Sequence, residues 1–294
     1  MYVYKVISEE LIIMMIFIHN IRWQFILQIL AASLLSSHAL AKDTLKYVHF
    51  EHQGDAHYGM IKGDNIQLLS GDIFSTHAVT DKTVALAEVT LLPATFPSKI
   101  IAVGLNYSSH FSATKGYAPR LFAKLPSALT GHEQAIWLYP NGDNLHYEGE
   151  LVVVIGKTAR NISVKDAPEY IFGVTAGNDV TERSWQASDL QWLRGKGADS
   201  FAPVSPWIST NLNYNDLLVE TRINGKTVQS ESTKSLLFSV DEIVSYASQY
   251  HTLYPGDLIF TGTPGSTRAM KAGDIVEVEV EGVGIIRNTV TPVK

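Results

Sequence analysis

Cysteine is absent from this chain of 294 residues, and its basic residues form no run. Without cysteine the chain has no disulfides, no thiolate metal site, no cysteine nucleophile and no lipid-anchored cysteine. The formal net charge of −6 argues against nucleic acid and anionic membrane surfaces as partners. Signatures of acyl-serine and nucleotide chemistry are also missing, and Ile136 stands where a zinc-protease motif after His132-Glu133 would need histidine.

The composition that remains is that of a folded globular protein. Hydrophobic residues make up 46% of the chain and charged residues 18%, so we expect a sizeable core rather than disorder. The length allows one large domain, or a main domain with a small one.

The first 41 residues form a separate segment. An apolar stretch over residues 25–35 follows Arg22, and Ala39-Leu40-Ala41 then supplies a small-residue cleavage site. This order is typical of a signal peptide, so residues 1–41 predict an exported, periplasmic protein with no membrane segment after cleavage. The alternative is an uncleaved anchor, because residues 11–18 add apolar length; polar residues interrupt that longer run.

After the signal segment, the chain reads as two regions. Apolar and polar residues alternate over 46–50, 57–61 and 66–69, with polar turns between them, which indicates short strands. Pro93 and Pro97 then mark a connector. We therefore predict a small β-rich subdomain over 43–95 and a main domain over 99–294.

In the main domain strands outnumber helices. Residues 99–104 and 275–281 have strand patterns, and Asn224-Gly225 is typical of a hairpin turn. Two helices are expected, each opened by a serine with an acidic residue three positions on: one over 163–172 and one from Ser239. The fold class predicted is β-rich α+β.

Two carboxylates at the start of an apolar strand are the first chemical signal. Strand side chains alternate faces, so Glu148 and Glu150 should point the same way, about 7 Å apart. With Asp179 they would fit a hard divalent cation such as magnesium. The alternative is a solvated strand edge that holds no ion.

Six motifs in fixed order give these carboxylates a context. In chain order they are Gly104-Leu105-Asn106-Tyr107-x-x-His110, Phe122-x-Lys124-x-Pro126-Ser127, Tyr147-Glu148-Gly149-Glu150-Leu151, Asn178-Asp179-Val180-Thr181-x-Arg183, Gln191-Trp192-Leu193-Arg194-Gly195-Lys196-Gly197 and Gly256-Asp257-Leu258-Ile259-Phe260-Thr261-Gly262-Thr263-Pro264. Together these motifs resemble the fumarylacetoacetate hydrolase family over residues 46–294.

The resemblance implies a mixed β-sandwich or roll core, a site for Mg²⁺ (or Mn²⁺, with Ca²⁺ as a further option) and a homodimer. It also implies roles by position: metal ligands Glu148, Glu150 and Asp179; Lys196 beside the metal; His110 as the base that activates water; and substrate contacts from Arg183, Gln186 and Thr263.

At one position the chain departs from the pattern. Hydrolases of the family carry His-x-x-Glu, where the glutamate orients the histidine, but this chain has Ala113. Glu133 is one substitute to consider. We predict hydrolysis of a carbon–carbon bond in a small 1,3-dicarbonyl or 2-oxo acid of the fumarylacetoacetate or acylpyruvate type. Alternatives are a decarboxylase, tautomerase or hydratase acting on a 2-oxo acid, and a protein that binds metal and oxo acid without turnover.

Overall fold

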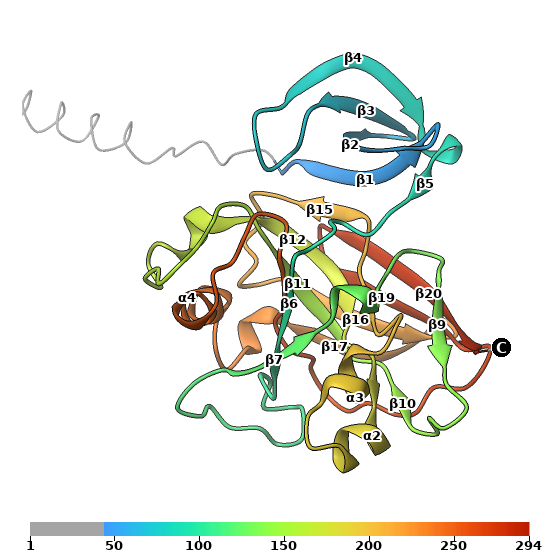
Figure 1. Ribbon diagram of the computed structural model, residues 1–294, viewed down its shortest axis with the longest axis vertical. Helices are drawn as coiled ribbons and strands as arrows, with labels where there is room; N and C mark the ends of the chain where they lie inside the picture. Colours follow the sequence, from blue (N-terminus) through green and yellow to red (C-terminus); the bar gives the residue numbers. More distant parts are fainter. Residues whose placement is uncertain (1–43, 294) are drawn as a thin grey trace, which may run out of the picture. The chain divides into compact units, whose positions relative to one another are not determined.

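Two large β-sheets dominate residues 44–293, the part of the chain that the computed structural model describes (Figure 1). The predicted signal peptide lies outside these residues. Within them, no helix is long and apolar enough to cross a membrane.

The first sheet has eleven strands in the order β4-β3-β2-β1-β15-β12-β11-β18-β6-β7, with β5 paired to β1. Its strands are β1 (Lys46–His52), β2 (Asp55–Lys62), β3 (Asn65–Ser70), β4 (Ala78–Ala85), β5 (Thr90–Leu91), β6 (Ile100–Gly104), β7 (Arg120–Lys124), β11 (Gly149–Ile155), β12 (Ile171–Asn178), β15 (Trp207–Ser209) and β18 (Leu258–Phe260).

The second sheet has five strands in the order β17-β16-β19-β20-β9, and two strand pairs complete the β-structure. The five are β9 (Ala135–Leu138), β16 (Leu218–Ile223), β17 (Lys226–Ser232), β19 (Ile275–Val280) and β20 (Gly284–Pro292). The pairs are β10 (Leu145–His146) with β13 (Thr181–Glu182), and β8 (Leu129–Thr130) with β14 (Ala202–Pro203).

Helices are few and short in the described residues, as the sequence predicts. The α-helices are α2 (Arg183–Ser188), α3 (Leu193–Gly197) and α4 (Val240–Tyr250). The single-turn 3₁₀ helices are η1 (Leu86–Glu88), η2 (Pro126–Ala128), η3 (Ala167–Tyr170) and η4 (Thr233–Ser235). The β-rich fold with a small N-terminal β subdomain is confirmed, and Figure 1 shows that subdomain as the blue to cyan strands β1–β4.

Strand β11 is the centre of the core because its side chains are buried on both faces. Leu151 and Val153 belong to one apolar cluster, which includes residues of β19 and α4. Val152 and Val154 belong to another cluster on the opposite face. A strand buried on both faces reads as a continuous apolar run rather than an alternating one, which is the pattern after Glu150.

The predicted helix over 163–172 is wrong. Ser163 and Asp166 do exchange hydrogen bonds, but this forms a local turn followed only by η3. Ile171 then opens β12, and its pairing with Ile155 takes the segment into the sheet. The helix expected from Ser239 is confirmed as α4, and Asn224 and Gly225, both with positive φ, form the predicted hairpin turn.

Candidate functional site

The strand order brings four chain segments to one edge of the first sheet. Strand β11 begins where its antiparallel neighbour β12 ends, with Gly149 opposite Asn178. Strand β18 is also antiparallel to β11 and ends at the same edge, and β6 runs parallel to β18. The start of β11 therefore lies beside the residues that follow β6, β12 and β18.

The three predicted metal ligands meet at this edge. Oxygen atoms of Glu148, Glu150 and Asp179 lie within 4.8 Å of one another, and the three residues are at most 4% exposed. The backbone N–H of Asp179 donates to the Glu148 carbonyl at 2.8 Å, which holds the ends of the two strands together. The solvated strand edge considered for Glu148 and Glu150 is excluded by this burial.

Two lysines neutralise part of this charge. Lys196 on α3 donates to Glu148 Oε2 at 2.7 Å and to Asp179 Oδ2 at 2.6 Å. Lys124 at the end of β7 donates to Asp179 Oδ1 at 2.5 Å and also contacts the Lys196 carbonyl. Lys124 belongs to one of the six sequence motifs, but the motif implies no role for it. Its position after the apolar residues Phe122 and Ala123 was the available sign that this lysine is buried.

The charges in the cluster are unevenly compensated. Burial alone would raise the pKa of Glu148, but the charges of Lys196 and Arg183 bring it well below its ordinary range. Burial and the neighbouring carboxylates of Asp179 and Glu148 raise the pKa of Glu150 well above its ordinary range. Its one protein donor in the described residues is the backbone N–H of Gly262, at 2.7 Å.

This donor set fits a hard divalent cation. Glu148, Glu150 and Asp179 offer clustered carboxylate oxygens, which magnesium and manganese prefer to nitrogen or sulfur ligands. A dication would compensate the charge of Glu150 that the protein leaves without a basic partner. Because three cationic side chains already face the three carboxylates, the loaded cluster would be positive and would attract an anionic acid.

His110 lies beside the carboxylates, in the segment after β6. Its Nε2 is 3.6 Å from Glu148 Oε1, and its Nδ1 is 2.7 Å from the Gly265 carbonyl oxygen. A carbonyl oxygen only accepts, so Nδ1 carries hydrogen and the free electron pair of the neutral ring lies on Nε2. Glu133 does not take the place of a glutamate at position 113, since it pairs with Arg287 and is 54% exposed.

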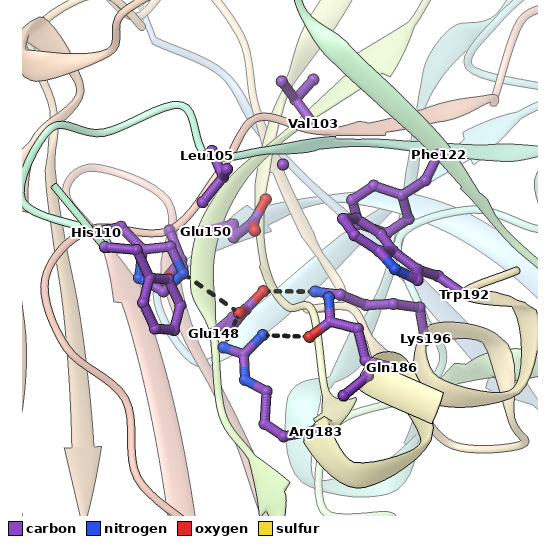
Figure 2. A pocket seen from close by; sticks show the side chains of 14 residues that line it. Val103, Leu105, His110, Phe122, Glu148, Glu150, Arg183, Gln186, Trp192 and Lys196 are labelled. Atoms are coloured by element: carbon purple, nitrogen blue, oxygen red, sulfur yellow. Dashed lines mark hydrogen bonds and ion pairs between the residues drawn. The ribbon is translucent and has the colours of Figure 1, made fainter. Parts of the chain in front are cut away.

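Arg183 and Gln186 on α2 border the same cavity. Arg183 contacts Glu148 Oε1 through Nη2 and donates to Gln186 Oε1 at 2.9 Å through Nη1. The cavity has a volume of about 310 Å³. Figure 2 shows Glu148 between His110 on one side and Phe122 and Trp192 on the other. The cavity is lined by Val103, Gly104, Leu105, His110, Phe111, Phe122, Glu148, Glu150, Arg183, Gln186, Ala187, Trp192, Lys196 and Thr263.

Thr263 lines the cavity, and its hydroxyl holds the backbone between the two glutamates. Thr263 Oγ1 donates to the Gly149 carbonyl at 2.9 Å, and the Gly149 N–H donates to Gln229 Oε1 at 3.1 Å. Gln229 Nε2 donates in turn to Thr263 Oγ1 at 2.8 Å. Gln229 comes from β17 of the second sheet and lies in none of the six sequence motifs.

Models of known families match nearly all of the described residues. The model described as fumarylacetoacetate (FAA) hydrolase, C-terminal, matches residues 99–291. A second, described as Rv2993c-like, N-terminal, matches residues 45–93. The chain belongs to the fumarylacetoacetate hydrolase family. Both matches lie within the described residues.

Members of the fumarylacetoacetate hydrolase family with similar sequences or structures have several names. The chain is 38% identical over 219 residues to the mitochondrial oxaloacetate tautomerase Fahd2a of Rattus norvegicus, covering 69% of this chain and 70% of that one. Its fold matches a 2-hydroxyhepta-2,4-diene-1,7-dioate isomerase from Mycobacterium marinum with a TM-score of 0.80 and 34% identity, covering 84% and 98% of the two chains. Its fold also matches a fumarylacetoacetate hydrolase from Exiguobacterium antarcticum with a TM-score of 0.77 and 33% identity, covering 85% of this chain and 100% of that one. The chain is therefore an enzyme of this superfamily.

Proposed function

We propose that this enzyme is a divalent-metal-dependent tautomerase that interconverts the keto and enol forms of a small 2-oxo acid. The observation that carries the proposal is the surroundings of His110. Its Nδ1 donates to the neutral carbonyl of Gly265, and no carboxylate of the described residues contacts this nitrogen. Hydrolysis of a carbon–carbon bond needs a base strong enough to activate water, and a neutral carbonyl stabilises the resulting imidazolium less than a carboxylate does.

Tautomerisation does not require the histidine to activate water. His110 Nε2 accepts a proton from the carbon next to the carbonyl, and the electron pair of that C–H bond forms the carbon–carbon double bond. The protonated His110 then returns this proton to the carbonyl oxygen, which leaves the enol and the neutral ring. The reverse sequence restores the ketone, so no water is consumed. When bound, a divalent cation supplies a Lewis acid that stabilises negative charge on the substrate oxygens. Glu148, Glu150 and Asp179 would hold it, and Lys196 would stay beside it.

The remaining polar groups of the cavity suit the acid end of such a substrate. Arg183 and Gln186 lie side by side on α2, and a guanidinium is well shaped to pair with a carboxylate. Phe122 and Trp192, in edge contact at 5.4 Å between ring centroids, form an apolar wall for the rest of the molecule. The names of the tautomerase and isomerase among the similar proteins support this choice.

Carbon–carbon hydrolysis is the second candidate. The similar fold of a fumarylacetoacetate hydrolase favours it. It uses the same metal ligands and the same base, but His110 would have to activate a water molecule. Binding of metal and acid without turnover is the third.

One assay separates these candidates. The purified chain from Lys42 onward is incubated with Mg²⁺ or Mn²⁺ and with oxaloacetate or acylpyruvates, while enol absorbance and products by mass are followed. Metal-dependent enol–keto exchange without cleavage supports the tautomerase, and cleavage products in its place support the hydrolase. Tight binding with neither activity overturns both enzymatic proposals.

Variants test the role of each group in the same assay. We expect His110→Gln to lower kcat about 10²–10⁴-fold, the usual contribution of a general base. Glu150→Gln should remove metal-dependent activity, and Glu133→Gln is the matched control because Glu133 lies away from the cavity on the surface. Wild-type activity in His110→Gln would contradict its assignment as the base.

Two further proposals concern the compartment and the assembly. From residues 1–41 we propose that the enzyme is exported to the periplasm, and from the family resemblance that it is a homodimer. Cell fractionation followed by sequencing of the amino terminus tests the compartment and cleavage after Ala41. Analytical ultracentrifugation of the mature chain tests the dimer. A full-length product in the cytoplasm, or a monomer, would contradict these two proposals.

A further inference from the structure

The Gly265 carbonyl that orients His110 belongs to a loop, and the loop needs support to hold it in place. Gly265 has a φ of +63°, and nothing lies within 4 Å of the position a side chain would take. A glycine so placed has many accessible backbone conformations. The position of its carbonyl therefore depends on the groups that hold the preceding peptide, between Pro264 and Gly265.

That peptide is held on both sides. The Pro264 carbonyl accepts from Gln229 Nε2 at 2.5 Å, and the Gly265 N–H donates to Ser109 Oγ at 2.9 Å. Ser109 Oγ donates in turn to Glu231 Oε2 at 2.5 Å. A hydroxyl has one hydrogen, so the bond to the carboxylate leaves its lone pairs to accept from Gly265.

Both supports are anchored on one strand of the second sheet, through Gln229 and Glu231. Gln229 and Glu231 are two residues apart on β17, so their side chains share a face of the strand. Gln229 reaches the peptide directly, and Glu231 reaches it through Ser109, the residue before His110. The histidine is thereby tied at its ring by Gly265 and, through its neighbour in the chain, by Glu231.

We propose that Ser109 and Glu231, together with Gln229, are positioning residues that hold the Gly265 carbonyl on Nδ1 of His110. They act through the loop and do not line the cavity. In this chain they give the histidine the orientation that a carboxylate at position 113 would otherwise supply. The consequence for turnover rests on the proposed role of His110 as base, whereas the consequence for the ring tautomer does not.

The experiment is ¹⁵N nuclear magnetic resonance of the histidine rings in the full mature chain, with His110→Gln used to assign the signal. Under mildly alkaline conditions the wild-type ring should carry its hydrogen on Nδ1. Ser109→Ala and Glu231→Leu should shift the ring toward a mixture of tautomers. Ser230→Ala is the matched control, because Ser230 is an exposed neighbour on β17 and makes none of these bonds.

Kinetics give the second measurement. Loss of one hydrogen bond in the relay should lower kcat about 3–10-fold with little change in KM, in keeping with the net value of about 1 kcal/mol for such a bond. Glu231→Gln keeps an acceptor oxygen and should recover most of this loss. Unchanged tautomer and unchanged kcat in both Ser109→Ala and Glu231→Leu would overturn the proposal. If no acid is turned over, the tautomer measurement still decides it.

Discussion

At the scale of single residues, the position between the two buried glutamates Glu148 and Glu150 accepts only glycine. A Cβ on Gly149 would lie 2.0 Å from Thr221 Oγ1, whereas its next nearest neighbours, methyl groups of Val278, would be 3.2 and 3.3 Å away. Gly149 is also held through its N–H and its carbonyl. The backbone at this residue cannot shift to admit a side chain without moving Glu148 or Glu150.

Gly149→Ala should therefore destabilise the protein by about 1–3 kcal/mol, the usual cost of overpacking, and weaken metal binding. Thr221→Ala removes the clashing oxygen, which is buried and without a hydrogen-bond partner, so the double variant should recover most of the stability. Urea unfolding of the wild type, both single variants and the double variant measures this coupling. Additive effects would contradict the clash as the cause.

The residue that sequence patterns leave without a role is Lys124. Its ammonium group is buried between Asp179 and the Lys196 carbonyl, and burial lowers its pKa in spite of Asp179. The apolar neighbours Phe122 and Ala123 indicate burial, but the local sequence does not identify the partner of this lysine. Its partner Asp179 is 55 positions away and is brought close by the order of the strands.

At the scale of elements, helix α4 shows a local signal that succeeded. Ser239 Oγ accepts from the Glu242 N–H at 3.3 Å, and the Glu242 carboxylate accepts from the Ser239 N–H at 2.8 Å. The same Ser-x-x-acid spacing at Ser163 failed, because Ile171 and Phe172 after it pair and pack with the sheet. Capping chemistry is local, and the burial of the following apolar residues decides whether a helix continues.

Ser239→Ala should lower the free energy of unfolding by about 1 kcal/mol, because it leaves the first turn of α4 with one N–H unsatisfied. Glu242→Ala should remove the reciprocal bond and also the surface ion pair with Lys115, at 2.9 Å. Gln249→Ala, on the exposed face of α4, leaves the box intact and is the comparison variant. Urea unfolding at neutral pH measures all three, and equal losses for Ser239→Ala and Gln249→Ala would contradict the capping role.

At the scale of the whole molecule, the carboxylate cluster of Glu148, Glu150 and Asp179 joins strands from distant parts of the chain, so a cation bound there should stabilise the entire fold. A ligand that binds only the folded state at 100 times its dissociation constant adds about 2.7 kcal/mol. We expect Mg²⁺ or Mn²⁺ to raise Tm in the wild type, excess chelator to reverse the rise, and Glu150→Gln to abolish it. Calorimetry at matched ionic strength makes the measurement; an equal rise in Glu150→Gln would place the cation elsewhere.

Stability should also depend on pH through His49, where the N-terminal subdomain meets the remainder of the sheet. Burial lowers the pKa of His49 from its ordinary 6.5, its Nδ1 donates to the Pro93 carbonyl at 2.6 Å, and its ring stacks on Tyr58. Because the folded-state pKa is the lower one, the unfolded chain binds more protons below pH 6.5. The stabilisation is therefore present above that value and is lost as the pH falls.

Urea unfolding between about pH 7.5 and about pH 5 checks this dependence. The wild type should lose more stability across the window than His49→Gln, whose side chain cannot gain a proton. Carboxylates that titrate in the same range contribute to both proteins and cancel in the difference. If the free energy of unfolding varied with pH equally in both proteins, His49 would not be the source of the pH dependence.

Much of the fold was predictable because its signals are local. Period-two alternation gave strands such as β19, and Asn224-Gly225 gave the turn between β16 and β17. The short helices α2 and α3 were not predicted, since six and five residues are too few for a helical period to show. The pairing of β1 with β15, which joins the small subdomain to the main sheet, has no local signal either.

The amino-acid sequence by itself determined the strands, the family, and the residue types that can bind a dication and an oxo acid. Only the tertiary structure decided which groups complete the site. Lys124 on Asp179, Gln229 on Thr263, and the Gly265 carbonyl on His110 join residues 55, 34 and 155 positions apart. Side-chain periodicity reports which face of its own strand a residue occupies. Which distant residue faces it depends on strand order and register, and these are set by packing the two sheets together.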